Sequence, residues 1–280
     1  MAAVLGTNIA SIYASKNLQG AQSSMATSVE RLSSGLRINR AKDDAAGLAI
    51  SNQLTQQING ANQGIKNLND GVSLIQTADG ALATVTEMAQ RILTLATQAS
   101  SGVLSTTQIT SIQTECTGLL EAIADIQVRS SVNGTLLFDD AALTIQSSNV
   151  SGDTIDITLT ALANFADDGA SGALEDLTDA VGNLADSTFA QALIDEAALY
   201  ITAIDTQRSE LGSLQNQMDF AITSVSQLSA DLSSARSRVI DTDYASETAT
   251  LTKGQILQQA ATAMLAQANQ MPNVILSLLK

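Results

Sequence analysis

The sequence predicts a mainly α-helical protein: a long antiparallel coiled-coil helical bundle with one small β-hairpin, and with its N- and C-terminal segments paired. Three observations lead to this fold class. Apolar residues recur every seven residues, in steps of three and four, at both ends of the chain, and this spacing keeps one seam facing a partner helix. The only proline is Pro272, so long helices can run almost unbroken before it. Aromatic residues make up only 2% of the chain, so Ala, Leu, Ile and Val must fill narrow helical seams.

The N-terminal half carries one short repeat and two long ones. The short repeat consists of Met25, Val29, Leu32 and Leu36. The second repeat is interrupted only where Asp79 falls on a seam position; its members are Leu54, Ile58, Ala61, Ile65, Leu68, Val72, Ile75, Leu82, Val85, Ala89, Ile92, Ala96 and Ala99. The third repeat consists of Ile109, Ile112, Cys116, Leu119, Ile123 and Ile126. Ser105 and Gln108 stand before the third repeat at the spacing of a capping box, which predicts the start of a helix there.

The C-terminal half carries two further repeats. The first consists of Leu211, Leu214, Met218, Ala221, Val225, Leu228, Leu232, Ala235 and Val239. The second consists of Leu257, Ala261, Met264, Ala268, Met271, Ile275 and Leu278. In an antiparallel hairpin of helices, Val225 and Leu228 lie opposite residues 65–85. We therefore expect Leu228 to be a buried seam residue, whose change to alanine costs about 2 to 5 kcal/mol.

The middle of the chain differs from its ends. Ile155, Ile157 and Leu159 alternate with polar residues, and Ser151–Gly152–Asp153 supplies turn chemistry before them. This pattern predicts one β-hairpin near residues 143–160. Residues 160–185 are rich in Ala, Gly and Asp without a clear period, and we expect irregular structure or a short helix there.

Composition excludes several classes of function. A formal net charge of −15 argues against a nucleic-acid partner and against an anionic membrane surface. The absence of histidine removes the commonest general base and most zinc sites, so we expect no catalytic site, no metal and no cofactor. The lone Cys116 cannot form an intrachain disulfide, and a buried small hydrophobe is expected. No apolar run reaches the roughly 20 residues of a membrane span, and no basic residue precedes Lys16, so the N-terminus makes a poor Sec signal peptide.

Charge is concentrated in two short segments between helical repeats. The first contains Arg37, Arg40, Lys42, Asp43 and Asp44, and the second contains Arg236, Arg238, Asp241 and Asp243. If the two ends of the chain lie side by side, these segments pair as connectors between an inner and an outer helical layer. Solvated loop charge is the alternative, because exposed ion pairs contribute only about 0 to 1 kcal/mol. Charge by itself leaves both interpretations open.

Long motifs at both ends of the chain resemble the bacterial flagellin family. "SSMATSVERLSSGLRINRAKDDAAGLAISNQL" (23–54) and "NDGVSLIQTADGAL" (69–82) are similar to the family's N-terminal region. "LSSARSRVIDTDYASE" (232–247) and "QILQQAATAMLAQANQMPNVILSLLK" (255–280) are similar to its C-terminal region. The resemblance covers roughly residues 1–138 and 190–280. The short interval between these halves implies a short form that lacks the family's large variable outer domain.

The resemblance implies a structural subunit that polymerises head-to-tail into the extracellular flagellar filament and serves swimming motility. Residues 1–44 with 237–280 are expected to form the inner tube, and residues 45–236 the outer core. The two charged segments are then connectors between those layers, with Arg37, Arg40, Asp43, Arg236, Arg238, Asp241 and Asp243 as their site residues. The family's partners are the chain itself, an export chaperone, the filament cap and the hook–filament junction proteins, and its members leave the cell unfolded through the type III export channel.

The terminal helix suggests how the subunits assemble. Its apolar stripe has little to cover it in a monomer, where the adjacent partner is a short N-terminal pattern. We therefore expect the polymerisation residues to be Ile9, Ile12, Leu18, Leu257, Ala261, Met264, Ala268, Met271, Ile275 and Leu278. A head-to-tail contact that does not close gives an open helical filament. Pro272 is expected to bend this helix.

A further resemblance concerns innate immunity. In the family, a host Toll-like receptor reads a helix bearing Q-R-x-x-E-L-A-x-Q, and residues 90–98 of this chain read QRILTLATQ, with Thr94 in place of the acid. Arg91 and Leu95 are four residues apart and share a helix face, and we expect Leu95 to lie exposed beside the seam. Glu115 resembles a further acidic contact. An ordinary solvated helix face is the alternative.

Two other classes of protein compete with a filament subunit. A hook–filament junction protein shares the terminal patterns, although residues 232–280 resemble flagellin more closely. Some flagellins carry a metalloprotease insert with H-E-x-x-H, but this chain has no histidine, and an enzyme is not expected. From the periodicity alone, a signalling coiled coil such as a chemoreceptor hairpin stays open.

Overall fold

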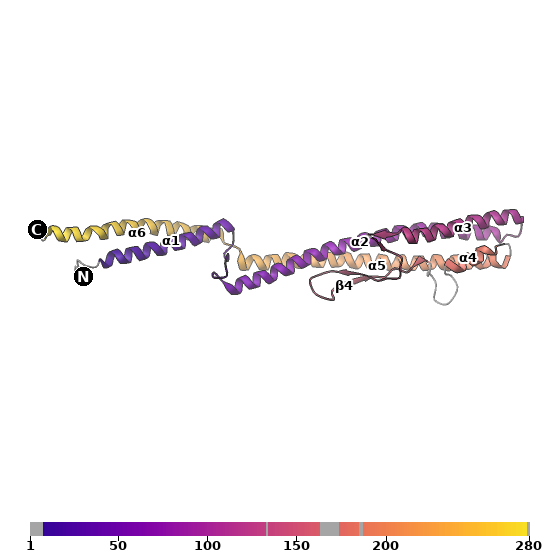
Figure 1. Ribbon diagram of the computed structural model, residues 1–280, viewed down its shortest axis with the longest axis horizontal. Coiled ribbons are helices and arrows are strands. Elements are labelled where there is room, and N and C mark those ends of the chain that lie inside the picture. The colour runs from indigo at the N-terminus through magenta and orange to yellow at the C-terminus, as the bar shows by residue number, and fades with distance from the viewer. Residues whose placement is uncertain (1–7, 133, 163–173, 185–186, 279–280) are drawn as a thin grey trace. The chain divides into compact units, whose positions relative to one another are not determined.

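The computed structural model describes residues 8–132, 134–162, 174–184 and 187–278 (Figure 1). Side chains of residues 174–176, 187–188 and 271–278 lie outside this description. The chain divides into two compact units, residues 1–57 with 231–280 and residues 58–230. Most described residues are helical, so the predicted mainly α fold class is confirmed. None of the described helices has the length and hydropathy needed to cross a lipid bilayer.

The first unit pairs the two ends of the chain. Helix α1 (Ile9–Ser34) lies beside helix α6 (Tyr244–Leu278), in antiparallel orientation (Figure 1). Asn8 caps the start of α1, because its side chain accepts a hydrogen bond from the amide of Ser11. Gly35 ends α1 in the left-handed conformation, at φ 72°, which is favourable for a residue without a Cβ atom.

The second unit is built from a bundle of helices with two small strand pairs. Its longest elements are residues 58–99 of helix α2 (Ala45–Ala99) and residues 187–230 of helix α5 (Ser187–Ile240). Helices α3 (Thr106–Arg129) and α4 (Leu174–Gly182) pack on each other. The side-chain oxygen of Gln108 accepts a hydrogen bond from the Ser105 amide at 2.9 Å, as the capping-box spacing predicts. The core is contributed by α2, α3, α4, α5 and the residues around the strands.

The predicted hairpin is present. Strand β3 (Leu143–Gln146) pairs antiparallel with β4 (Thr154–Ile157), with Leu143 opposite Ile157 and Gln146 opposite Thr154. A second strand pair, β1 (Ser131–Val132) with β2 (Thr135–Leu136), was not expected. Strands of two residues are too short to show a period, and the Asn-Gly dipeptide at 133–134 is the only sequence signal for their turn.

Helix α4 lies within the region expected to be irregular or a short helix; of that region, residues 163–173 and 185 lie outside the described residues. Its buried residues, among them Leu177, Ala180 and Val181, belong to the core. The prediction therefore holds for the part of the region that the structure describes.

Two burial predictions are wrong. Leu228 is 49% exposed, whereas Leu211 and Met218 are fully buried on the same helix. Beyond Met218 the face turned to α2 includes Ile222 and Ser229, because a straight helix drifts by about 20° per heptad from a strict seven-residue repeat.

Leu95, expected to be exposed, is only 2% exposed. It belongs to one core cluster with residues of α3, α4 and α5, so more than one helix packs around this part of α2. On this part of α2, the stripe that contains Leu95 is consequently buried in addition to the predicted seam of Ile92, Ala96 and Ala99.

Candidate assembly interface

The contact between α1 and α6 follows heptad spacing, and its buried residues (Ala21, Ser28, Gly254, Ala261 and Ala268) are all small. On α1 the less exposed positions are Ser11, Ala14, Leu18, Ala21, Met25, Ser28 and Leu32. On α6 they are Glu247, Leu251, Gly254, Gln258, Ala261, Leu265 and Ala268. A Cβ atom on Gly254 would lie 3.6 Å from the Cβ atom of Met25, in ordinary contact. Small side chains let two helices approach closely, so this pair is thin and buries few large apolar groups.

Polar contacts fix the two ends of this helix pair. At one end, the side-chain amide of Asn8 donates to the carbonyl oxygen of Ala268 at 2.7 Å, and the Ser11 hydroxyl donates to Asn269 Oδ1 at 3.1 Å. At the other end, the Arg31 guanidinium lies 3.5 Å from a carboxylate oxygen of Glu247. These pairs set the alignment of α1 along α6.

The expected polymerisation residues separate into two groups. Ala261 and Ala268 are buried against α1, and Leu18 is half-buried. Ile9, Ile12, Leu257 and Met264 are exposed, Met264 by 64%. The side chains of Met271, Ile275 and Leu278 lie outside the described residues.

The contact stripe of each terminal helix therefore differs from the predicted one. On α1, Ser28 is buried at the contact with α6, whereas Val29, a member of the predicted short repeat, is exposed. On α6 the stripe in contact with α1 runs through Gly254 and Leu265, beside Leu257 and Met264. The predicted and observed stripes of α6 share Ala261 and Ala268, but the contact is completed by Gly254 and Leu265 rather than by Leu257 and Met264.

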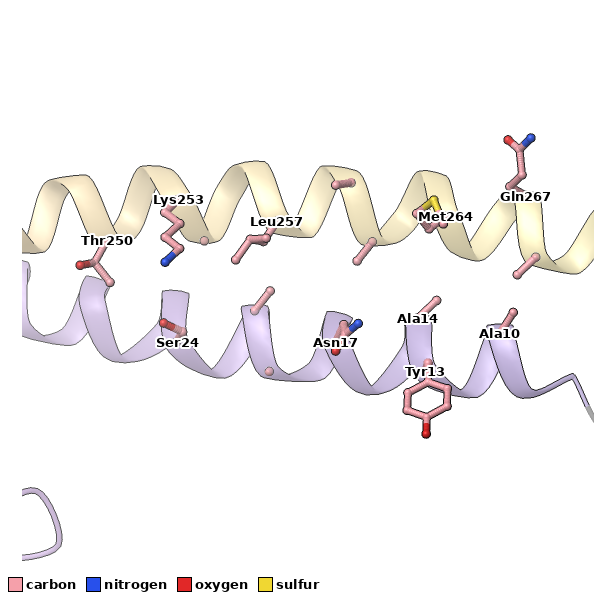
Figure 2. A pocket seen from close by; sticks show the side chains of 16 residues that line it. Ala10, Tyr13, Ala14, Asn17, Ser24, Thr250, Lys253, Leu257, Met264 and Gln267 are labelled. Atoms are coloured by element: carbon pink, nitrogen blue, oxygen red, sulfur yellow. The ribbon is translucent and has the colours of Figure 1, made fainter. Parts of the chain in front are cut away.

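A groove of about 840 Å³ lies along α1 and α6. It is lined mostly by small residues, with Tyr13, Lys253, Leu257 and Met264 as its largest side chains. Figure 2 shows Tyr13 directed away from α6 and Gln267 directed away from α1. Tyr13, Leu257 and Met264, which line this groove, are exposed in the isolated chain.

The two charged segments lie side by side within the first unit. Leu36 and Asp241 form an antiparallel bridge. The Arg37 amide donates to the carbonyl oxygen of Ile240 at 2.7 Å, and the Thr242 amide donates to that of Gly35 at 2.9 Å. The pairing is made mainly by the backbone.

Most charged side chains in these segments bond to nearby residues of the same stretch of chain and not to the other segment. Arg40 forms an ion pair with Glu30 at 2.8 Å, and Asp43 Oδ2 accepts the amides of Asn39 and Arg40. Asp243 caps the start of α6, where it accepts the amides of Ala245 and Ser246.

Arg238 donates to the hydroxyl of Ser234 on its own helix, and Arg236 is half-buried on that helix. Arg37 is different, because its guanidinium reaches the Val239 carbonyl oxygen of the other segment at 2.6 Å.

The residues that resemble a receptor contact lie on neighbouring helices of the second unit. Arg91 on α2 donates through Nε and Nη2 to Glu115 Oε1 on α3, at 2.9 and 2.7 Å, and both side chains are about half exposed. Leu95 is buried below them. The neighbouring Cys116 is fully buried, as expected, and burial followed by the Glu115 carboxylate raises the pKa of its thiol from 9.0 to about 11.

Comparison with known proteins decides the family. Residues 5–142 match the bacterial flagellin N-terminal helical region, and residues 192–279 match the bacterial flagellin C-terminal helical region. A flagellin of Halalkalibacterium halodurans is 39% identical over 99% of this chain and 100% of its own length. The chain belongs to the bacterial flagellin family. A flagellin of Bacillus subtilis is 38% identical over 98% of each chain.

Among solved structures, the crystal structure of Bacillus cereus flagellin is 26% identical and covers 57% of this chain and 88% of that chain, with a TM-score of 0.49. In the present chain, only residues 143–191 lie between the two matched regions, which fits a short form of flagellin without a large variable domain.

As a flagellin, the chain is a structural subunit of the extracellular bacterial flagellar filament and self-polymerises; it is not an enzyme.

Proposed function

We propose that residues 1–44 with 237–280 form the inner tube of the filament and that residues 45–236 form its outer core. In this proposal subunits join head-to-tail through the exposed apolar side chains of the first unit. The observation that carries it is that α1 and α6 cover each other with small residues and leave Ile9, Ile12, Leu257 and Met264 exposed. Exposed apolar groups clustered on one helix pair mark an interaction surface.

The second copy of the chain is the occupant that this surface fits best. The unit is nearly uncharged along the groove, where Lys253 is the only charged residue that lines it. An apolar channel bordered by Leu257 and Met264 suits another apolar helix, and each subunit carries such helices at its ends. Because each subunit presents the surface and can fill it, the contact can repeat from subunit to subunit, and a head-to-tail contact of this kind that does not close gives an open filament.

Deletion of residues 255–280 tests the proposal. The truncated chain is expected to keep the helices of residues 58–230, to stay soluble and to form no filaments, as judged by circular dichroism and electron microscopy. Filaments of normal appearance would exclude these residues from the inner tube.

A pair of point variants sharpens this test. Met264→Glu places a charge on an exposed position, so the monomer should keep its melting temperature while the critical concentration for assembly rises at least about tenfold, the equivalent of about 1.4 kcal/mol. Met264→Leu keeps the apolar surface and should assemble normally.

We further propose that the export chaperone, the filament cap and the hook–filament junction proteins of the family bind this chain through the same uncovered surface. The support is that Leu257 and Met264 are exposed before assembly. A partner that prevents premature polymerisation, or that binds the end of the filament, would bind the surface through which subunits polymerise. Export through the type III channel is consistent with the thin α1–α6 contact, which has few large buried groups to unfold.

A host Toll-like receptor is the remaining proposed partner. The exposed ion pair of Arg91 and Glu115 supports it, since the two groups lie together on the surface of α2 and α3. Leu95 is buried in the core of the monomer, so we do not propose it as a direct receptor contact. Thr94, whose hydroxyl donates to the Gln90 carbonyl oxygen, offers no charge to a receptor.

A further inference from the structure

The apolar contacts between α2 and α5 repeat every seven residues. On α2 the fully buried residues include Leu68, Ile75, Leu82 and Ala89, and on α5 they include Ile204, Leu211 and Met218. If α2 slid along α5 by one heptad, apolar residues would again meet apolar residues. Heptad packing therefore distinguishes the native register only weakly from registers displaced by seven residues.

One ion pair does distinguish these registers. Arg208 Nε on α5 lies 2.7 Å from Asp79 Oδ1 on α2, at the point where a carboxylate interrupts the apolar repeat. The hydrogen bond to Asp79 raises the pKa of Arg208, so the guanidinium stays charged. After a slide of seven residues in either direction, Asp79 would face Gln215 or Ile201. Both partly buried charges would then lose their ion pair, and in the register that places Asp79 beside Ile201 the carboxylate would face an apolar side chain.

Gln207, the neighbour of Arg208, is a buried polar residue with four hydrogen bonds. Its side-chain oxygen accepts the amide and the hydroxyl of Thr160, at 3.4 and 3.1 Å. Its side-chain amide donates to the Thr158 carbonyl oxygen at 3.2 Å and to Glu210 at 3.4 Å. Gln207 is only 5% exposed, so loss of these partners would leave a buried amide unsatisfied.

The β3–β4 hairpin is attached to both helices. The side-chain amide of Asn67 on α2 donates to the carbonyl oxygen of Gln146, at the end of β3, at 3.0 Å. The chain that leaves β4 is held to α5 through Thr158 and Thr160. Since β3 and β4 are paired with each other, a slide of α2 along α5 would break one of the two attachments.

We propose that the Asp79–Arg208 pair, Gln207 and the attached hairpin together set the axial register of α2 against α5. A slide of one heptad moves a helix by about 10 Å, since each residue rises about 1.5 Å. A polymer built from identical subunits needs the same surface on every copy, so a single register is a condition for regular assembly. The register is a property of the monomer and is independent of which face polymerises.

Disulfide trapping in the full-length monomer tests this proposal. The hydroxyl of Ser229 donates to Asn62 Oδ1 at 2.9 Å, so Asn62→Cys with Ser229→Cys reports the native register. Asn69→Cys with Ser229→Cys, and Asn62→Cys with Ile222→Cys, report the two registers displaced by one heptad. The native Cys116 is fully buried and its raised thiol pKa, about 11, keeps it out of exchange near neutral pH.

Each reporter pair is placed in the native sequence and in a variant with Asp79→Leu, Gln207→Leu and Arg208→Leu. In the native sequence only the native pair should cross-link. In the leucine variant the displaced pairs should cross-link at least about threefold more than in the native sequence, because apolar heptads alone permit both registers. Cross-linking of the native pair alone in the leucine variant would overturn the proposal.

A charge exchange supplies the matched control. In the Gln207→Leu background, Asp79→Arg with Arg208→Asp keeps an ion pair at the same place and should restore the native cross-linking pattern that is lost with Asp79→Leu and Arg208→Leu, whereas displaced cross-links there would overturn the role of the pair. If circular dichroism shows that the leucine variant is not helical, Asp79→Asn with Gln207→Met and Arg208→Met, which stays closer to the native side-chain shapes, decides the same question. Displaced cross-links in that variant support the proposal, and their absence overturns it.

Discussion

The carbonyl oxygen of Ser147 fills the space in which a side chain on Gly64 would lie. Asn149 is placed in the same way over Gly60, and the Met218 side chain over Gly71. The three glycines lie on α2; at Gly60 and Gly64 the hairpin approaches the helix backbone more closely than a Cβ atom would permit, and at Gly71 the end of the Met218 side chain would lie only 3.1 Å from a Cβ atom. Glycine usually weakens a helix, and here its cost is offset by this close packing.

Gly64→Ala is therefore expected to destabilise the monomer by about 1 to 3 kcal/mol, because the added methyl group displaces Ser147 and the hairpin behind it. Gly80→Ala is the matched control. No atom lies within 4 Å of a Cβ at Gly80, and this exposed helical position should gain about 0.5 to 1 kcal/mol. Urea unfolding measures both. Equal effects of the two substitutions would contradict the close approach at Gly64.

Leu211→Ala should destabilise the monomer by about 2 to 5 kcal/mol, as large-to-small changes in a packed core do, since Leu211 is fully buried. Leu228→Ala on the same helix should change stability by less than about 0.5 kcal/mol, because that side chain is half exposed. Thermal unfolding of the two variants compares them directly. A large loss of stability in Leu228→Ala would show that Leu228 is a buried seam residue after all, as the strict heptad pattern predicts.

Arg91→Ala is expected to lower activation of the host receptor by monomeric protein about tenfold, the usual worth of one lost charge-assisted hydrogen bond. The substitution also frees Glu115 from its partner. A reporter cell line measures the response, and circular dichroism verifies that the helices persist. Glu115→Gln, which keeps the shape of that side chain, separates the two groups. An unchanged response to Arg91→Ala would remove Arg91 from the proposed contact.

Monomer stability should decline between about pH 9 and 11 through Cys116. Burial raises its thiol pKa from 9.0 to about 11, so the folded state holds the proton more tightly than the unfolded state. The stabilisation is complete below pH 9 and is lost as pH rises toward 11, up to about 2 kcal/mol. Chemical unfolding of the native chain and of Cys116→Ala across this range measures the difference. Parallel curves for the two proteins would show that the thiol does not contribute.

Sequence periodicity predicted the helices and the hairpin correctly because these depend on local spacing. Pairing of the ends and burial of Cys116 also followed from the sequence. The seam positions were less predictable. Leu228 is exposed, Leu95 is buried, and α6 meets α1 through Gly254, Ala261, Leu265 and Ala268 rather than through Leu257 and Met264. A heptad pattern names the apolar positions, but it does not say how many helices surround them.

The charged segments illustrate the same division. Their position between helical repeats was visible in the sequence, and so was the prospect that they pair. That Leu36 meets Asp241 through the backbone, and that Arg40 turns back to Glu30, required the structure.

The sequence by itself determined the helical class, the start of the helix after Ser105, the hairpin at residues 143–160 and the family, because these reside in local propensity, period and ordered motifs. The tertiary structure alone decided which stripe of each helix is covered, where glycines admit the hairpin, and which carboxylate meets Arg208. Those outcomes depend on the distances between backbones. Such distances are set by side-chain volumes from segments that lie far apart in the sequence, which no local pattern records.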